Sequence, residues 1–229
     1  MNDFSLVPIA RYHGDFPAKF GIPRQAGVVE ALEGRIVFEP EYRCADALRG
    51  IEGFSHLWLI WQFSEAVREG WSPTVRPPRL GGNRRMGVFA TRSPFRPNSL
   101  GLSCVRLLGV ESDAKLGSML RVSGADLMDG TPIFDIKPYL PYADCVPQAS
   151  AGFAPDSGEK LKVQILPEAE RMIPNGKLPA LIGVLENDPR PRYQADGRVY
   201  VMEFAGTELS FSVHGDVLTV EKVIETFTI

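Results

Sequence analysis

The sequence has few of the residues from which metal centres and disulfide frameworks are built. It contains three cysteines and three histidines, all widely spaced, with no C-x-x-C pair and no H-x-x-x-H motif. Structural zinc sites and disulfide frameworks need closely spaced or paired ligands. We therefore predict neither of them, and no bound metal.

Long apolar runs and an export signal are also missing. The longest apolar stretch, His56–Phe63, is far shorter than the roughly 20 residues that a membrane-spanning helix needs. The N-terminal residues lack a basic region followed by an apolar stretch and a cleavage site. We therefore expect a cytoplasmic protein with no membrane association. A chain of 229 residues can hold one large domain, or one domain with a smaller partner.

Three common motifs of catalysis and nucleotide binding are absent. The chain has no G-x-S-x-G sequence, no Walker loop and no G-x-G-x-x-G after a strand. These patterns mark serine hydrolases, P-loop enzymes and Rossmann-type nucleotide sites, respectively. The residues alone therefore do not indicate any of these three classes.

The sequence does contain a concentration of arginine in the stretch Val75–Leu102. This stretch holds six arginines and no acidic residue, interspersed with proline, glycine and asparagine. Guanidinium groups bind phosphate oxygens in pairs and tolerate partial burial, so the stretch predicts a site for a phosphate-bearing or otherwise anionic partner. The alternative is a solvated surface loop that its prolines constrain.

Most of the first 145 residues have the pattern of short strands with few helices. Ser55–Phe63 is predicted to be a strand buried on both faces, and Pro40–Ile51 contains a short helical pattern. Such spacing favours a closed barrel or a sandwich. The other expected strands of this part are Leu6–Tyr12, Arg35–Phe38, Met86–Ala90, Leu100–Val110 and Ser118–Ser123.

The character of the chain changes after this region. Gln148–Glu159 is small and polar, which is typical of a linker, and shorter strand and helix patterns follow it. We expect a mainly β protein with two domains. Residues 1–147 form a β-barrel-like domain, and residues 148–229 form a smaller α+β domain.

An Asp-Gly pair marks a second candidate site, at Asp129-Gly130-Thr131. Glycine after aspartate favours a tight turn with a positive φ angle, which lets backbone groups approach a ligand closely. The alternative is a turn with a purely structural role.

Four motifs, in this order, resemble the TsaA/YaeB family of tRNA methyltransferases. The segment Asp188–Tyr193 (DPRPRY) also resembles part of the C-terminal domain of bacterial members. The four motifs are PRQ (Pro23–Gln25), ADALRGIEGFSHLW (Ala45–Trp58), GWSPTVRPPRLGGNRRMGVFATRSPFRPNSLGLS (Gly70–Ser103) and LMDGTPIFDIKPYLPYAD (Leu127–Asp144).

The resemblance implies an S-adenosylmethionine-dependent enzyme that methylates N6 of N6-threonylcarbamoyladenosine beside the anticodon of tRNA. It also implies a single-sheet β-barrel and a homodimer. Ser64 and Glu65 stand where some relatives have a His-Gln pair, so contacts from them would have to come from backbone atoms. The other cofactor residues that the resemblance implies are Gln25, Ala26, Gly27, Arg92, Leu102, Met128, Asp129, Gly130 and Thr131.

The reaction that this family performs suggests roles for further residues. The acceptor nitrogen is a poor nucleophile, so a carboxylate base would help it lose its proton. Our hypothesis is that Asp129 or Asp135 is this base and that Lys137 and Tyr139 position the modified nucleoside. The alternative for Asp129 is that it only caps the turn and binds the cofactor.

The arginines would then bind the anticodon stem-loop, while an aromatic side chain such as Phe95 or Trp71 stacks on a base. The competing hypothesis for the whole chain is a non-catalytic barrel that binds an adenosine-containing ligand or RNA. The arginines expected to follow the RNA backbone are Arg76, Arg79, Arg84, Arg85 and Arg96.

Overall fold

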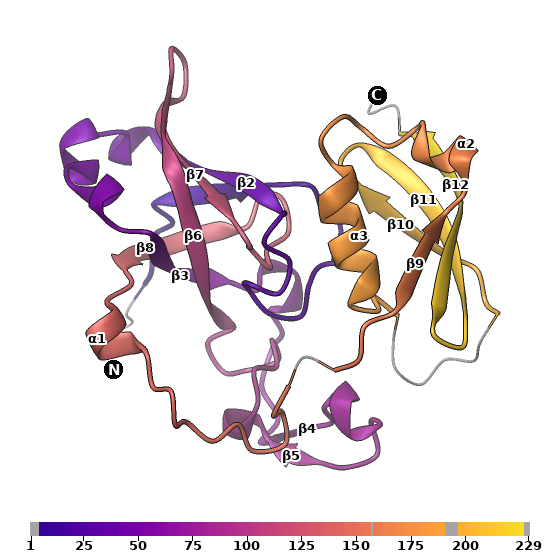
Figure 1. Cartoon of the computed structure of the whole chain (residues 1–229). Coiled ribbons are helices and arrows are strands. Elements are labelled where there is room, and N and C mark those ends of the chain that lie inside the picture. The colour runs from indigo at the N-terminus through magenta and orange to yellow at the C-terminus, as the bar shows by residue number, and fades with distance from the viewer. Residues whose placement is uncertain (1–4, 157, 191–196, 227–229) are drawn as a thin grey trace.

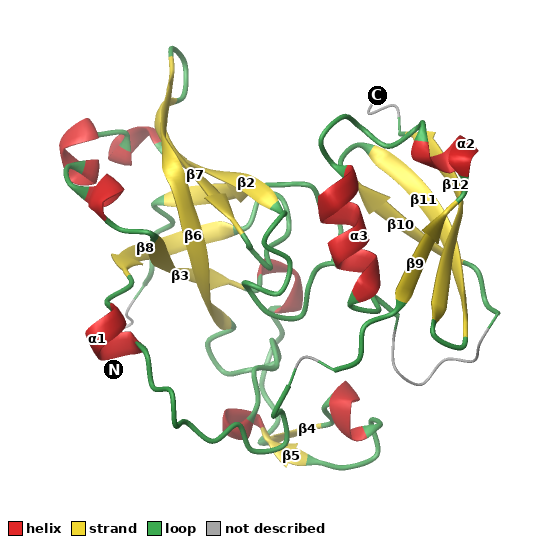
Figure 2. Cartoon of the chain, viewed as in Figure 1, coloured by secondary structure: helices red, strands yellow, loops and turns green. Residues whose placement is uncertain are grey.

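The computed structural model describes residues 5–156, 158–190 and 197–226. The prediction of a mainly β chain is confirmed, because strands dominate and form two separate sheets and one short hairpin (Figures 1 and 2). Residues 191–193 of the DPRPRY segment lie outside the described residues. Within the described part, no helix has both the length and the apolar character that crossing a lipid bilayer requires.

The first sheet is a closed ring, because its last strand hydrogen-bonds to its first. Each strand runs antiparallel to both neighbours. The ring surrounds an apolar core that includes Ile36, Leu59 and Leu120, all of them fully buried. The order around the ring is β1 (Ala10–His13), β2 (Glu33–Phe38), β7 (Gly117–Ser123), β6 (Leu100–Asp113), β3 (His56–Gln62) and β8 (Pro132–Pro138).

Two local expectations for this region were wrong. Strand β3 is not buried on both faces: Leu57, Leu59 and Trp61 point inward, whereas the residues between them are only partly buried. Its outer face is nevertheless rich in apolar residues, so the sequence shows no polar alternation. The expected strand Met86–Ala90 is shorter than predicted, because β5 (Met86–Gly87) is followed at once by a 3-10 turn.

The second sheet has four strands and belongs to the C-terminal part of the chain. Its order is β10 (Tyr200–Phe204), β11 (Thr207–His214), β12 (Val217–Glu225) and β9 (Lys162–Ile165), and β9 runs parallel to β12. Two helices accompany it, α2 (Pro167–Glu170) and α3 (Leu178–Glu186). Helix α3 lies between this sheet and the ring (Figure 1).

The remaining elements are short. A hairpin of β4 (Thr74–Val75) and β5 lies at the bottom of the view in Figure 1, below the two sheets, and helix α1 (Pro141–Asp144) follows β8. The helical pattern expected over Pro40–Ile51 is a series of 3-10 turns. The 3-10 turns are Pro40–Tyr42, Ala45–Leu48, Ile51–Gly53, Ser64–Ala66, Pro78–Leu80 and Val88–Ala90.

Candidate functional site

The Asp-Gly turn is fixed against strand β1. One carboxylate oxygen of Asp129 accepts a hydrogen bond from the backbone N–H of Gly14 and lies 3.1 Å from Nδ1 of His13. Gly130 has the positive φ angle that the sequence predicts, 75°, and its N–H donates to the carbonyl of Tyr12 at 2.8 Å. Thr131 donates its hydroxyl proton to the carbonyl of Met128 at 2.7 Å. The Asp129 side chain therefore has a structural role, because it links the turn to the end of β1.

A second group of predicted residues lies where the loop between β1 and β2, which carries Gln25 and Gly27, contacts other parts of the chain. The guanidinium of Arg92 donates to the side-chain carbonyl of Gln25. The N–H of Gly27 donates to the carbonyl of Gly124 at 2.8 Å, which fastens this loop to the end of β7. Gly27 itself has φ +78° and open space where a Cβ would be. These contacts bring together residues that are 67 positions apart in the sequence.

The same place contains a carboxylate that we did not assign from the sequence, that of Asp126. Ser103 is 1% exposed, and its hydroxyl donates to Oδ1 of Asp126 at 2.5 Å. The indole N–H of Trp61 in turn donates to the oxygen of Ser103 at 2.9 Å. Burial raises the pKa of Asp126, while the hydrogen bonds from Ser103 and the backbone of Ala26, and the charge of Arg92, act in the opposite direction.

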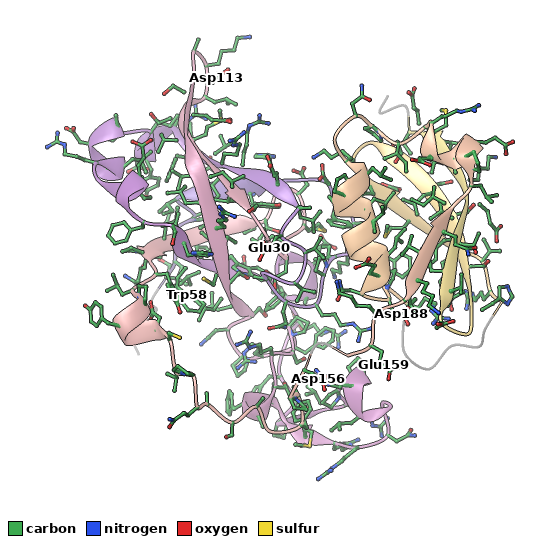
Figure 3. All side chains as sticks on the ribbon, viewed as in Figure 1. Glu30, Trp58, Asp113, Asp156, Glu159 and Asp188 are labelled. Atoms are coloured by element: carbon green, nitrogen blue, oxygen red, sulfur yellow. The ribbon has the colours of Figure 1, made fainter. Side chains whose placement is uncertain are left out.

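Four other predicted residues lie on the outer face of the ring. Leu102 on β6 is 57% exposed, and across the sheet Asp135 and Lys137 on β8 form an ion pair of 3.0 Å. Tyr139 packs its ring against Trp58, with centroids 5.9 Å apart, and Figure 3 shows Trp58 on the side of the ring that faces α1. No hydrogen bond or ion pair within the described residues connects this outer group with Arg92 or Gln25.

Ser64 and Glu65 are exposed in a 3-10 turn after β3. The backbone carbonyl of Glu65 accepts a hydrogen bond from Nζ of Lys19 at 2.6 Å. Lys19 belongs to the same loop as Gln25. The backbone carbonyl of Glu65 thus faces this loop, while the contacts of Ser64 and Glu65 with a cofactor stay a prediction.

The predicted arginines fall into two kinds. Arg76, Arg84 and Arg85 are exposed around the β4–β5 hairpin. Arg79 is paired with Asp156 of the segment that follows α1, at 2.5 Å, and Arg96 donates to the carbonyl of Thr91 within its own loop at 2.8 Å. Arg79 and Arg96 therefore already hold local structure, whereas the first three are exposed, with Arg85 donating a hydrogen bond of 3.4 Å to the hydroxyl of Thr74.

Two aromatic side chains stand in the open beside these arginines. Trp71 is 54% exposed and Phe89 is 73% exposed, and their rings lie 6.0 Å apart at 32°. The face of Phe95 is covered by the guanidinium of Arg68, 3.8 Å from the ring centroid. Trp71 thus remains a candidate for stacking, and Phe89, which we did not single out from the sequence, joins it.

The residues missed from the sequence are Asp126, Ser103, Trp61 and Phe89. Asp126 and Ser103 are 23 positions apart and meet only through the way that β6, β7 and the loop after β7 are arranged. A hint was available, because both residues stand at the edges of the recognised motifs. Phe89 gave no signal, since an apolar residue in a predicted strand is ordinarily buried.

Comparison with known proteins covers nearly the whole chain. Residues 11–145 match the family model described as the tRNA-methyltransferase O N-terminal domain, and residues 158–226 match that of the TrmO C-terminal domain. An Escherichia coli protein named tRNA (adenine(37)-N6)-methyltransferase is 42% identical over 212 residues, which are 88% of this chain and 90% of that protein.

Two further similarities come from Pseudomonas aeruginosa. A protein named putative S-adenosylmethionine-dependent methyltransferase RcsF is 42% identical over 199 residues, 83% of each chain. The crystal structure of TrmO superposes with a TM-score of 0.79 at 33% identity, and the match covers 97% of this chain and 99% of that one. The similarity thus extends over both sheets.

Proposed function

The chain belongs to the tRNA-methyltransferase O family and is a tRNA methyltransferase that acts on N6 of adenine 37; from this premise we propose that its acceptor is N6-threonylcarbamoyladenosine and its methyl donor is S-adenosylmethionine. The observation that carries the donor assignment is the meeting of Gln25, Ala26 and Arg92 around the carboxylate of Asp126. We place the reaction in the cytoplasm, where mature tRNA is available.

The residues at this place fit such a donor chemically. S-adenosylmethionine supplies a methyl group on a positively charged sulfur, together with a carboxylate and a ribose diol. The guanidinium of Arg92 can bind a carboxylate with two parallel hydrogen bonds. Gly27 and Gly130 both have open space where a side chain would otherwise stand, so a ligand can approach their backbone closely.

The remaining predicted residues keep their proposed roles in this scheme. We propose that Ser64, Glu65 and Met128–Thr131 line the donor site; the support for Glu65 is that its backbone carbonyl accepts a hydrogen bond from Lys19 of the loop that carries Gln25. We propose that Lys137 and Tyr139 bind the threonylcarbamoyl group, because a lysine ammonium can hold the carboxylate that this group adds. Asp129 and Asp135 remain candidates for the base, although each already has a partner, His13 and Lys137 respectively.

The acceptor assignment has a direct test. Transfer RNA would be prepared with and without the threonylcarbamoyl group on adenine 37, and each form incubated with enzyme and labelled S-adenosylmethionine. We expect methylation only of the modified tRNA, with the label recovered in one nucleoside by mass analysis. Equal labelling of both forms would overturn the acceptor assignment, and labelling of neither would overturn the activity itself.

We propose that tRNA binds across the β4–β5 hairpin. Three exposed arginines there, Arg76, Arg84 and Arg85, can contact phosphates, and the open pair Trp71 and Phe89 can stack on unpaired bases. Base stacking on an aromatic ring contributes roughly 1–3 kcal/mol per base. No acidic residue occurs between Val75 and Leu102, and Asp156, which lies against this segment, is paired with Arg79.

Salt dependence separates the two kinds of contact. Replacing Arg84 or Arg85 with alanine should weaken tRNA binding and lower the slope of log affinity against log salt by about 1 for each lost phosphate contact. Phe89→Ala should weaken binding with the slope unchanged. Arg49→Ala is the matched control, because Arg49 is an exposed, ion-paired arginine on another part of the chain. Unchanged binding by the hairpin variants would exclude this surface.

We further propose that the protein is a homodimer. In this dimer, the outer face of the closed ring of one copy contacts the donor site of the second copy. The support is that Leu102, Asp135 and Lys137 lie on this outer face while Arg92 and Gln25 lie elsewhere. An exposed leucine beside the half-buried Trp58 and Ile60 is a natural apolar contact. Sedimentation should give a dimer mass, and Leu102→Asp should give a monomer. A monomeric wild type at micromolar concentration would contradict this.

We retain the proposed division of the chain into residues 1–147 and residues 148–229. It separates the two sheets, and the two matched family models fall on either side of it.

A further inference from the structure

A chain of hydrogen bonds fixes the Asp126 side chain in one direction. An indole N–H can only donate, so Ser103 must accept from Trp61, and the one hydroxyl proton of Ser103 is left to donate to Asp126. Trp61 is 6% exposed and Ser103 is 1% exposed, so water does not replace either contact. Oδ1 of Asp126 is thereby held as an acceptor. The Asp126 carboxylate also accepts a hydrogen bond from the backbone of Ala26 and feels the charge of Arg92, and the residue is partly exposed.

This carboxylate differs from the other two candidates. Asp129 is bound by His13 and the N–H of Gly14, and Asp135 is bound by Lys137 on the outer face. Of these three carboxylates, Asp126 is the one that accepts a backbone hydrogen bond from Ala26 and feels the charge of Arg92, two residues expected to hold the donor. Its hydrogen-bond chain consists of the buried side chains of Ser103 and Trp61, whereas His13 and Lys137, the partners of the other two, are exposed.

We infer that Asp126 is the general base of the methyl transfer, held in place by Ser103 as a positioning residue. This inference rests on the proposed function. The carboxylate takes the proton from N6 of the acceptor, and the nitrogen lone pair forms the new bond to the methyl carbon. The bond from sulfur to that carbon breaks, and its electron pair stays on the sulfur, which becomes neutral. The proton leaves later from Asp126 to water.

The charges around Asp126 suit this role. Burial raises the pKa of Asp126, which makes its ionised form a better proton acceptor, and the nearby charge of Arg92 limits that rise. Tyr12 also faces Asp126, and the carboxylates of Asp15 and Asp129 lie around the same tyrosine. Burial, together with these carboxylates, raises the pKa of Tyr12, so Tyr12 stays neutral and does not compete as a base.

The first experiment compares Asp126→Asn with Asp129→Asn and Asp135→Asn. Asparagine keeps the size of the side chain and can still accept from Ser103. We expect Asp126→Asn to lower kcat by roughly 10²–10⁴-fold, while calorimetric affinity for S-adenosylmethionine changes by less than about threefold. The other two variants should keep a larger share of kcat. Near-normal kcat for Asp126→Asn, or an equal loss in Asp135→Asn, would overturn the inference.

The second experiment tests the positioning role of Ser103 through the pH profile. In the wild type, kcat should fall on the acid side as Asp126 takes up a proton. Ser103→Ala removes a hydrogen bond that lowers the pKa of Asp126, so this acid limb should move to higher pH. A lower kcat with an unmoved limb would mean a merely structural role for Ser103.

Two controls keep the result interpretable. Asp126→Glu retains a carboxylate and should recover part of the activity, with an acid limb that Asp126→Asn lacks. If the wild type itself methylates no tRNA, the proposed function has failed. If the wild type is active and Asp126→Asn keeps near-normal kcat, only the inference about Asp126 has failed. If Asp126→Asn loses donor binding but not turnover at saturation, Asp126 binds the donor and is not the base.

Discussion

The two hydrophobic cores of this chain differ in how much of the sequence each one uses. The core of the ring is built from residues between Ile9 and Ile136. The core of the second sheet combines residues after Leu161 with Phe16, Val29 and Leu32, which precede most of the ring. A boundary at residue 147 therefore separates the two sheets but cuts across the second core.

The segment that joins the second core, residues 16–32, is here called the crossing segment. Phe16 packs edge-on against Phe204, with ring centroids 5.3 Å apart, and Val29 touches helix α3 at Gly183. Just before it, Asp15 pairs with Lys177 at 2.7 Å, and the Asp15 side chain is only 10% exposed. The crossing segment also carries Gln25, Ala26 and Gly27. The C-terminal part thus holds the loop on which donor binding is proposed to depend.

The largest effect should come from cutting into the second core. Phe204→Ala removes a fully buried ring and should cost about 3–5 kcal/mol of the free energy of unfolding. All three tryptophans lie between Trp58 and Trp71, so their fluorescence reports on the ring region alone, whereas circular dichroism reports on both sheets. In this variant we expect the circular-dichroism transition to move to lower denaturant concentration than the fluorescence transition. We also expect the affinity for the donor to fall.

The matched change in the ring is Leu59→Ala, which should cost about 2–5 kcal/mol and move the fluorescence transition instead. If both probes shift together in both variants, the two cores unfold as one cooperative unit. The contrast between them would then be one of sequence only, not of stability.

A substitution at Gly183 of helix α3 should have a smaller effect on stability, and it tests a single contact, that between helix α3 and Val29 of the crossing segment. A methyl group added at Gly183 would lie 2.7 Å from Cγ1 of the buried Val29. Overpacking costs roughly 1–3 kcal/mol, against a gain of about 1 kcal/mol in helix propensity, so we expect Gly183→Ala to lose about 1 kcal/mol. Because Val29 belongs to the crossing segment, amide hydrogen exchange at Gln25–Gly27 should become faster.

Double substitution tests whether that loss passes through Val29. The loss in Gly183→Ala/Val29→Ala should be smaller than the sum of the two single losses by about 1 kcal/mol. Gly53→Ala is the control, since a methyl group there meets nothing within 4 Å and its φ angle is not positive. Additive losses, or unchanged exchange at Gln25–Gly27, would show that the crossing segment does not respond to helix α3.

The sequence predicts local features of this arrangement but not its long-range ones. The Asp-Gly pair predicted the turn at Gly130, and the strand expected over Ser118–Ser123 is part of β7, because both depend on neighbouring residues. Strand β8 was missed, since it begins and ends with proline, which is unusual for a strand that has partners on both sides. Within the crossing segment, Phe16–Gly27 has two prolines and no apolar periodicity, which predicts a loop. Its apolar residues face a core more than 130 residues away, so local pattern could not assign them.

The candidate site was predictable to the same degree. Resemblance pointed to Gln25 and Arg92, which do meet, but not to the Asp126–Ser103 pair. That pair depends on the pairing of β6 with β7 and on the path of the chain after β7. Register is a global property of a sheet, and a single sequence does not fix it.

The smallest expected effect concerns how folding stability depends on pH. The contribution of Asp126, beside the ring, should change with pH in the opposite direction to that of Asp216, in the C-terminal part. Burial raises the pKa of Asp126 beside the ring, whereas Lys162 lowers the pKa of Asp216 in the second sheet. A carboxyl whose pKa is raised on folding binds its proton more tightly in the folded state. Its stabilising effect is present below the unfolded pKa, near 3.8, and is lost as pH rises through the folded pKa. For Asp216 the effect is present above 3.8 and is lost as pH falls through the lowered folded pKa.

Melting temperatures of Asp126→Asn and Asp216→Asn, measured between pH 3 and pH 7, should therefore depart from the wild type in opposite directions at neutral pH. Asp126→Asn should melt at a higher temperature. At neutral pH the wild type buries an ionised carboxylate, which destabilises the fold, and asparagine removes that charge. Asp216→Asn should melt slightly lower, because an exposed pair with Lys162 is lost. If Asp126→Asn melts lower at pH 7, the hydrogen bonds from Ser103 and Ala26 together with Arg92 outweigh burial. Asp126 would then be a stabilising residue, and the proton affinity that favours it as a base would be absent.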